Sequence, residues 1–502
     1  MSKYISYLFF FVLALFLFLS SWYAINGDMY IHTDIARDFH LLDEIDEKKI
    51  VLIGPRSSAG GLFHGPHWLY LLYPGYILGN GNPVVMAWYW IFLTGVFLLG
   101  SYFVAKRMFD STVAKLYVLL LAGFLLFLAR EFLNPIGAFF VMPFFIYTFY
   151  TYVKKRDWRY LAGAILLLGL MIQFQMAAGA PILILTGFAT LFVAIKYKKY
   201  FHPLLFALIP VSLINFIVFD VRHGFNLTKA YMHNLSSEGG NQSITYLQLV
   251  LERIERIIEV QLINNSPDFL NSVVFFSTVG LLILAFRHTK NKLFYLLFVY
   301  FYVGYFTLSL LSKHAMLNHQ FYPMLPLLFL CMASFVTIKK YKSLATIFVV
   351  VIIFANLVRG GIYAHYSSRD FIGYDQDSWK FLHTIASDVY SFNDDDFGYF
   401  VYAPDTFAYE PKYAMYYTQK EFKNKGHRFE KKHITYLVIA PPPPDKPFMG
   451  DRWWTENKAR ISNKPVMTKT YPNGFKIEKY VLTDEEIAIQ PDPMIDPGIS
   501  SR

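Results

Sequence analysis

The chain has 502 residues, of which 55% are hydrophobic, 19% aromatic and only 16% charged. A soluble domain carries about 25% charged residues, so this composition argues against a soluble protein and indicates a membrane protein with many spans. The net charge of +10 does not indicate a nucleic-acid partner, because the lysines and arginines fall in short clusters between apolar runs. The single cysteine, Cys331, excludes a disulfide framework and a zinc site built on several thiolates.

Eleven apolar runs reach, or nearly reach, the length of about 20 residues that a transmembrane helix needs. We expect the first run to be retained, because it is longer than the apolar part of a typical signal peptide and lacks a convincing cleavage site. The third and fifth runs are the weakest. The runs lie at residues 4–24, 84–105, 112–129, 135–153, 158–175, 180–196, 203–219, 269–287, 292–311, 320–338 and 343–359.

The connections between these runs alternate in charge. Every second connection carries lysines and arginines, from Lys3 at the amino terminus to the cluster at 339–342. By the positive-inside rule these connections are cytoplasmic, which places the amino terminus inside. We therefore expect a multi-pass transmembrane domain over residues 1–362 in the cell membrane, with outer loops at 26–74 and 220–270.

The second outer loop contains the pattern of an amphipathic helix, SITYLQLVLERIERIIEVQLI. We expect this helix either to lie along the outer membrane surface or to pack on the protein's own outer domain. Its apolar side holds Leu247, Leu251, Ile254, Ile258 and Leu262, and its polar side holds Glu252, Arg253, Glu255 and Arg256.

From about residue 363 the composition becomes that of a soluble domain. Strands are predicted in FGYFVYAP, HITYLVIAPPPP and FKIEKYVLT, and a helix is predicted in QDSWKFLHTIASDVY. An odd number of spans leaves the carboxyl terminus outside. We expect a small extracytoplasmic α/β domain at 363–488 and a disordered tail at 489–502.

The first outer loop concentrates acids, histidines and arginines beside the membrane, where titratable groups usually have a function. The pattern HTDIARDFHLLDEI predicts a helix that starts near Thr33 and carries Asp34, Arg37 and Asp38 on one side. The opposite side is expected to face the membrane through Ile35, Phe39 and Leu42.

An acid in the first turn of a helix faces the positive end of the helix dipole, so we expect Asp34 to be ionised near neutrality. It could then accept a proton from a hydroxyl group or hold a metal ion. The same spacing also fits a solvated face on which Arg37 only pairs with Asp34 or Asp38.

The loop continues with GPRSSAGGLFHGPHWLYLLYP, which is rich in glycine and proline. Such a segment suits a backbone that folds closely around a ligand. The alternative is an ordinary turn before an interfacial helix that is anchored by Trp68 and Tyr70.

These features resemble the GT-C membrane glycosyltransferases, and among them the branch of the protein O-mannosyltransferases and lipid A aminoarabinose transferases. The resemblance consists of an amino-terminal span, an outer Asp-x-x-Arg helix, a second segment ending in HGPHWLYLLYP, and many spans with an outer carboxyl-terminal domain. It implies sugar transfer from a polyprenyl-phosphate donor to a lipid, protein or glycan acceptor. The acid of the family's first loop falls on Asp34 and its arginine on Arg37, with Asp38 as the next candidate.

Displacing a lipid phosphate from a sugar also needs cations that hold the departing phosphate. Relatives in this family tend to carry a lysine before the prolines of the second segment, where this chain has His64 and Gly65. Several outer candidates also have a plain interpretation as helix-end residues. The candidates for binding the donor phosphate are Arg56, His64, His67, Arg222, His223, Lys313, His314 and His319.

No cofactor is clearly indicated by the sequence. If a divalent cation takes part, Asp34 and His64 are its candidate ligands. A transporter or lipid flippase is the competing function, but the predicted spans carry almost no charged residues at their centres and the halves show no repeat. An oligosaccharyltransferase or a ligase of whole glycans would use the same fold and similar acids.

Overall fold

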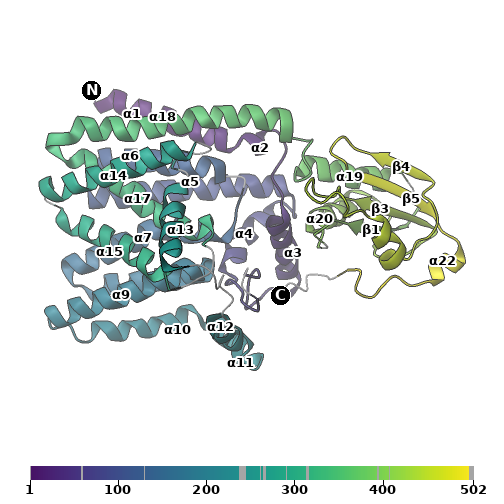
Figure 1. Ribbon diagram of the computed structural model, residues 1–502, viewed down its shortest axis with the longest axis horizontal. Helices are drawn as coiled ribbons and strands as arrows, with labels where there is room; N and C mark the ends of the chain where they lie inside the picture. The colour runs from purple at the N-terminus through teal and green to yellow at the C-terminus, as the bar shows by residue number, and fades with distance from the viewer. Residues whose placement is uncertain are drawn as a thin grey trace. The chain divides into compact units, whose positions relative to one another are not determined.

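The computed structural model describes residues 2–57, 60–128, 131–236, 245–260, 262–263, 267–289, 291–311, 316–392, 395–405 and 407–496. The chain divides into two compact units (Figure 1). The first unit comprises Met1–Ser20, Ile50–Leu71 and Trp90–Ile362. The second comprises Ser21–Lys49, Leu72–Tyr89 and Tyr363–Arg502.

Within the described residues, nine helices are long and apolar enough to cross a membrane. They are α1 (Ser2–Ser20), α5 (Pro83–Met108), α6 (Ser111–Leu128), α7 (Asn134–Lys155), α9 (Met176–Lys196), α14 (Asp268–His288), α15 (Lys292–Ser309), the helix Asn318–Thr337 that includes α17 (Leu325–Ser334), and Lys339–Phe371, which includes α18 (Lys342–Tyr366). A pair bent by 55°, His202–Ser212 and Ile214–Arg222, counts as a tenth if it forms one span.

A shorter apolar helix, α8 (Trp158–Phe174), falls on the fifth expected run. Each of the eleven expected runs therefore coincides with an apolar helix or with the bent pair. This confirms a multi-pass helical membrane protein. In lipid, helices satisfy their backbone hydrogen bonds internally, which is why an unbroken apolar run predicts them so well.

The centre of the first unit is formed by α6 and α17. Every residue of α17 is buried, and α6 is buried along almost its whole length. Aromatic rings fill the space between neighbouring helices, with Phe97 stacked on Phe140 at 4.3 Å and Phe124 on Phe139 at 5.6 Å between ring centroids. Close packing of this kind, rather than a hydrophobic effect, holds helices together in a membrane.

The second unit contains a five-stranded sheet in the order β2-β1-β3-β5-β4. Its strands are β1 (Phe397–Tyr402), β2 (Gly426–Arg428), β3 (Ile434–Ile439), β4 (Met467–Thr470) and β5 (Lys476–Val481). Strand β1 pairs in parallel with β2 and β3, whereas β5 is antiparallel to β3 and β4. Because β1 and β3 are buried along nearly their whole length, they have the apolar runs that made them visible in the sequence.

The described carboxyl-terminal part of this unit also contains the helices α19 (Trp379–Ser391) and α20 (Tyr409–Thr418) and the short α21 (Arg452–Trp454) and α22 (Asp484–Ala488). The expected small α/β domain is therefore confirmed (Figure 1). Of the expected tail at 489–502, residues 489–496 are described and residues 497–502 lie outside the described part of the chain. Asp492 pairs with Lys458 at 2.8 Å and Asp496 pairs with Arg428 at 2.5 Å, so two acids fix this segment to the domain.

Candidate functional site

Helix α3 (Thr33–Lys48) begins where the sequence predicts it. Its amino-terminal cap is His32, whose Nδ1 accepts a hydrogen bond from the Asp34 amide at 3.2 Å. This cap places Asp34 in the first helical turn.

Arg37 joins the two acids of this helix. Its guanidinium lies 2.7 Å from Asp34 Oδ1 and 2.9 Å from Asp38 Oδ1. The side chains of Arg37 and Asp38 are only 12% and 2% exposed, whereas Asp34 is 53% exposed. Burial lowers the pKa of Arg37, but Asp38 and Asp34 outweigh it and the pKa is raised. The cluster therefore keeps one carboxylate, Asp34, oriented and accessible to a second reactant.

The apolar side of α3 does not face the membrane, which corrects the expectation for this helix. Ile35, Phe39 and Leu42 are buried within the protein. The Phe39 ring lies 4.9 Å from the ring of Tyr413 in α20, between centroids. An apolar stripe predicts that a helix has an apolar neighbour, but it does not say whether lipid or protein is that neighbour.

The second unit also contains a half-buried acid that the sequence analysis missed. Glu410, at the start of α20, accepts a hydrogen bond from Thr33 Oγ1 at 2.6 Å. Burial raises the pKa of Glu410 to about 7, and the Thr33 hydrogen bond opposes this rise. The local sequence AYEPKYAM gives no signal for this contact, because its partner lies 377 residues away.

In the first unit, the glycine- and proline-rich segment folds into a tight hairpin. The Gly54 amide donates to the His64 carbonyl at 2.8 Å, and the His64 amide donates to the Pro55 carbonyl at 2.8 Å. A Cβ on Gly54 would lie 2.3 Å from the Gly65 carbonyl oxygen, so the two arms can approach only without a side chain. On this hairpin Arg56 is exposed and His64 is half-buried, while His67 begins α4 (His67–Leu78).

The hairpin lies beside α11 (Ile214–Arg222). Asn215 Nδ2 donates to the Leu52 carbonyl at 2.9 Å, and the Phe63 ring lies 6.2 Å from that of Phe219. Phe219 in turn stacks on His223, with 4.0 Å between ring centroids. The structure thus brings the hairpin that bears two of the predicted phosphate-binding residues next to the segment that bears two more.

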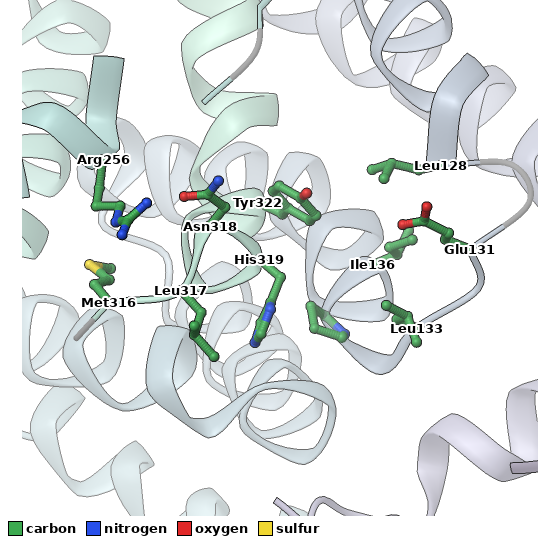
Figure 2. A pocket seen from close by; sticks show the side chains of 11 residues that line it. Leu128, Glu131, Leu133, Ile136, Arg256, Met316, Leu317, Asn318, His319 and Tyr322 are labelled. Carbon is green, nitrogen blue, oxygen red and sulfur yellow. The ribbon is translucent and has the colours of Figure 1, made fainter. Parts of the chain in front are cut away.

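The first unit also contains a cavity of about 280 Å³ (Figure 2). Its lining comes from residue 128 and residues 131–136, from Arg256 in the expected outer loop at 220–270, and from residues 316–322. Four of its polar lining residues are Glu131, Arg256, His319 and Tyr322. In Figure 2, Arg256 and Glu131 stand on opposite sides, with His319 and Tyr322 between them. Of the predicted phosphate-binding residues, the cavity contains His319.

Glu131 and Arg256 lie in stretches where the sequence showed no motif for this cavity. Lys313 and His314 of the prediction fall outside the described residues.

One wall of this cavity comes from α13 (Tyr246–Glu259), the predicted amphipathic helix. Part of its polar side faces the protein: Arg253 is 1% exposed, and Glu252 Oε1 accepts a hydrogen bond from the Met316 amide at 3.4 Å, whereas Glu255 is exposed. Its apolar side is open, with Leu247 69% exposed. This pattern is typical of a helix whose apolar side meets lipid. Leu262, beyond the helix end, departs from the expectation because it is buried.

Among the described residues, no group of three or more His, Cys, Asp or Glu side chains could hold a metal ion. Arg37 already supplies a positive charge beside Asp34. Metal ligation by Asp34 and His64 stays a prediction.

The sequence matches no protein-family model and no curated protein. The fold, however, matches solved structures. The crystal structure of ArnT from Cupriavidus metallidurans bound to undecaprenyl phosphate matches with a TM-score of 0.60 and 12% identity, over 98% of this chain and 100% of that chain. Its apo state gives a TM-score of 0.61 and 12% identity over 95% and 98%. The chain has the fold of ArnT.

This match confirms the GT-C-like fold that the first loop and the span pattern predicted, including the carboxyl-terminal domain. At 12% identity it speaks for the fold alone. The oligosaccharyltransferase of Archaeoglobus fulgidus, in its apo form, gives a TM-score of 0.46 and 13% identity over 83% of this chain and 64% of that chain.

Proposed function

We propose that this protein is a membrane glycosyltransferase that moves a sugar from a polyprenyl-phosphate donor to an acceptor on the outer face of the cell membrane. The observation that carries the proposal is Asp34, an exposed carboxylate held by Arg37 in the first turn of α3. It occurs in a chain whose fold matches, over 98% of its length, a structure with undecaprenyl phosphate bound. The outer location rests on the charge pattern of the connections.

The reaction needs a base and a place for the departing phosphate. The acceptor oxygen forms a bond to the anomeric carbon while the bond from that carbon to the donor phosphate breaks. Asp34 takes the proton of the acceptor hydroxyl, and Arg37 holds the carboxylate in position. The departing polyprenyl phosphate carries negative charge, so its release needs cations, for which the predicted arginines and histidines remain the candidates.

The flippase is the competing function, and it makes a different prediction. A flippase moves the lipid-linked sugar across the membrane but leaves it attached to its lipid. A glycosyltransferase makes a new glycosidic bond and leaves the lipid phosphate behind. The fate of the label on the sugar therefore separates the two functions.

The test uses membrane vesicles from cells with and without the full-length protein. The probe is a lipid extract of the source organism in which the polyprenyl-phosphate sugars are radiolabelled. We expect label to move from the lipid fraction into an acceptor only in vesicles that contain the protein. Label that changes leaflet but stays in the lipid fraction would support the flippase, and label that does neither would overturn the proposal.

A further inference from the structure

We infer that the carboxyl-terminal domain is a working part of this transferase, in which Glu410 is a positioning residue that orients the first turn of α3, and hence Asp34, through Thr33. This inference rests on the proposed function, because it assigns a role at the same site. It gives the domain a task that neither its sheet nor its composition indicates.

The first step is the anchor of the chain just before α3. Asp28 is fully buried, and its carboxylate accepts hydrogen bonds from the amides of Gly373 and Lys380 and from Ser378 Oγ, at 2.6–3.0 Å. The Ile31 amide donates to the Asp377 carbonyl at 2.8 Å. These hydrogen bonds therefore fix the segment that leads into α3 to the start of the carboxyl-terminal domain. The two segments are more than 300 residues apart in the sequence.

The second step is the body of the helix. His40 contacts the Tyr409 carbonyl at 3.3 Å, and the hydroxyls of Tyr76 and Tyr416 donate to Asp43 at 2.9 and 2.5 Å. These contacts hold the middle of α3 against α20 and α4. Both ends of the helix remain exposed, the first turn at Asp34 and the last turn at Glu47 and Lys48.

The third step is the contact at that turn. Thr33 Oγ1 donates to Glu410 Oε1 at 2.6 Å, one residue before Asp34. A hydrogen bond to an ionised acceptor is roughly twice as strong as one to a neutral acceptor. The contact therefore holds the turn more firmly when Glu410 is ionised than when it is protonated.

The charge of Glu410 is costly where it lies. A glutamine would accept the same hydrogen bond without the cost of burying a carboxylate. Burial raises the pKa of Glu410 to about 7, and Asp405 and Asp377 add smaller contributions in the same direction. The group thus changes charge near neutral pH, which a purely structural contact does not need.

Two carboxylates on neighbouring loops, Asp405 and Asp377, act on Glu410. Next to its partner Thr33, α3 carries the charged groups Asp34, Arg37 and Asp38, and Asp375 acts on Asp377. Asp377 also has a pKa raised by burial, to about 6.

The test measures the initial rate of label transfer against pH in vesicles with the parent, Glu410→Gln, Thr33→Val and Thr33→Ser. We expect the parent rate to rise about fivefold as the pH passes through about 7, because the hydrogen bond becomes charge-assisted. Glu410→Gln should lose this rise. Thr33→Val should be slow at every pH, and Thr33→Ser should recover both the rate and the rise, because it keeps the hydroxyl.

The control is Glu421→Gln, an exposed acid of the same domain whose partner is His383. It should keep the parent profile. A parent-like rise in Glu410→Gln, or a Thr33→Val variant as fast as Thr33→Ser, would overturn the inference. If Glu410→Gln does not fold, the two Thr33 variants decide the question alone.

An Asp34→Asn variant in the same series separates this inference from the proposed function. Full transfer by Asp34→Asn would contradict the role of Asp34 itself. Loss of transfer in Asp34→Asn together with a parent-like profile in Glu410→Gln would leave the proposed function standing and remove only the role of Glu410.

Discussion

Helix α3 carries two aspartate–cation pairs with the same spacing, one at each end. Asp34 and Arg37 lie 2.7 Å apart at the start, and Asp46 and Lys49 lie 3.0 Å apart at the end. The two aspartates are similarly exposed, at 53% and 47%, but Arg37 is 12% exposed and Lys49 is 67% exposed. Arg37 also binds the buried acid Asp38, whereas no second acid among the described residues pairs with Lys49. Asp46 instead accepts a hydrogen bond from the Tyr73 hydroxyl at 2.8 Å. Sequence spacing alone therefore predicts that an aspartate and a cation can pair. Whether the pair holds the aspartate in a fixed orientation depends on the burial of the cation.

The largest expected effect on stability comes from removing the two cations in turn. Arg37→Gln leaves Asp38 buried without the cation that pairs with it, so we expect a loss of about 3 kcal/mol in the free energy of unfolding. Lys49→Gln removes an exposed pair that solvent screens, so its cost should be much smaller. Denaturation in detergent measures both. Equal losses would mean that the two ends of α3 do not differ as we describe.

The second prediction compares Glu410, which contacts the start of α3, with the exposed acid Glu421 of the same domain, and it concerns how stability depends on pH. The pKa of Glu410 is about 7 in the folded protein and 4.5 in the reference state, so between these values the folded state holds a proton that the unfolded state has lost. Stability should therefore fall as the pH rises from about 4.5 to about 7, by up to about 3 kcal/mol from this group.

Glu410→Gln should remove this part of the fall, whereas Glu421→Gln should keep it. Unfolding measured at several pH values in the two variants gives the answer. An unchanged slope in Glu410→Gln would show that Glu410 is not the group that titrates.

The third prediction compares two histidines of the first unit, His319, which lines the cavity and is a predicted phosphate-binding residue, and His288, which does not line it. His319→Ala should raise the KM for the labelled donor about tenfold with a smaller effect on kcat, because it removes a hydrogen-bond donor to the phosphate. His288→Ala, on the last turn of α14, is the control and should leave KM unchanged. A KM that is equal in the three proteins would remove His319 from the candidates.

The fourth prediction changes neither rate nor stability and concerns only orientation. Cysteine placed at Ser57 or at Ser387 should react with a membrane-impermeant thiol reagent in intact cells, because the charge pattern places both outside. The native Cys331 is buried, so it should not react with the reagent. Protection of both sites until the cells are lysed would reverse the topology.

The sequence predicted the features that depend on neighbours along the chain. The eleven apolar runs, the start of α3 near Thr33 and the side shared by Asp34, Arg37 and Asp38 follow from periodicity, and the structure has them. It could not predict that Phe39 meets Tyr413 or that Thr33 meets Glu410, because those contacts join segments more than 370 residues apart. The three-residue strand β2 was missed because such a short piece takes its order from tertiary contacts.

The central claim is that Asp34 is the base of a glycosyl transfer. The most direct measurement compares transfer by Asp34→Asn and by Asp46→Asn, two variants with the same chemical change on the same helix, at equal protein levels. Both aspartates are about half exposed and asparagine has nearly the same size, so both variants should fold. We predict that Asp34→Asn loses about a hundred- to ten-thousand-fold in rate and that Asp46→Asn keeps the parent rate. Equal rates in the two variants would contradict the claim.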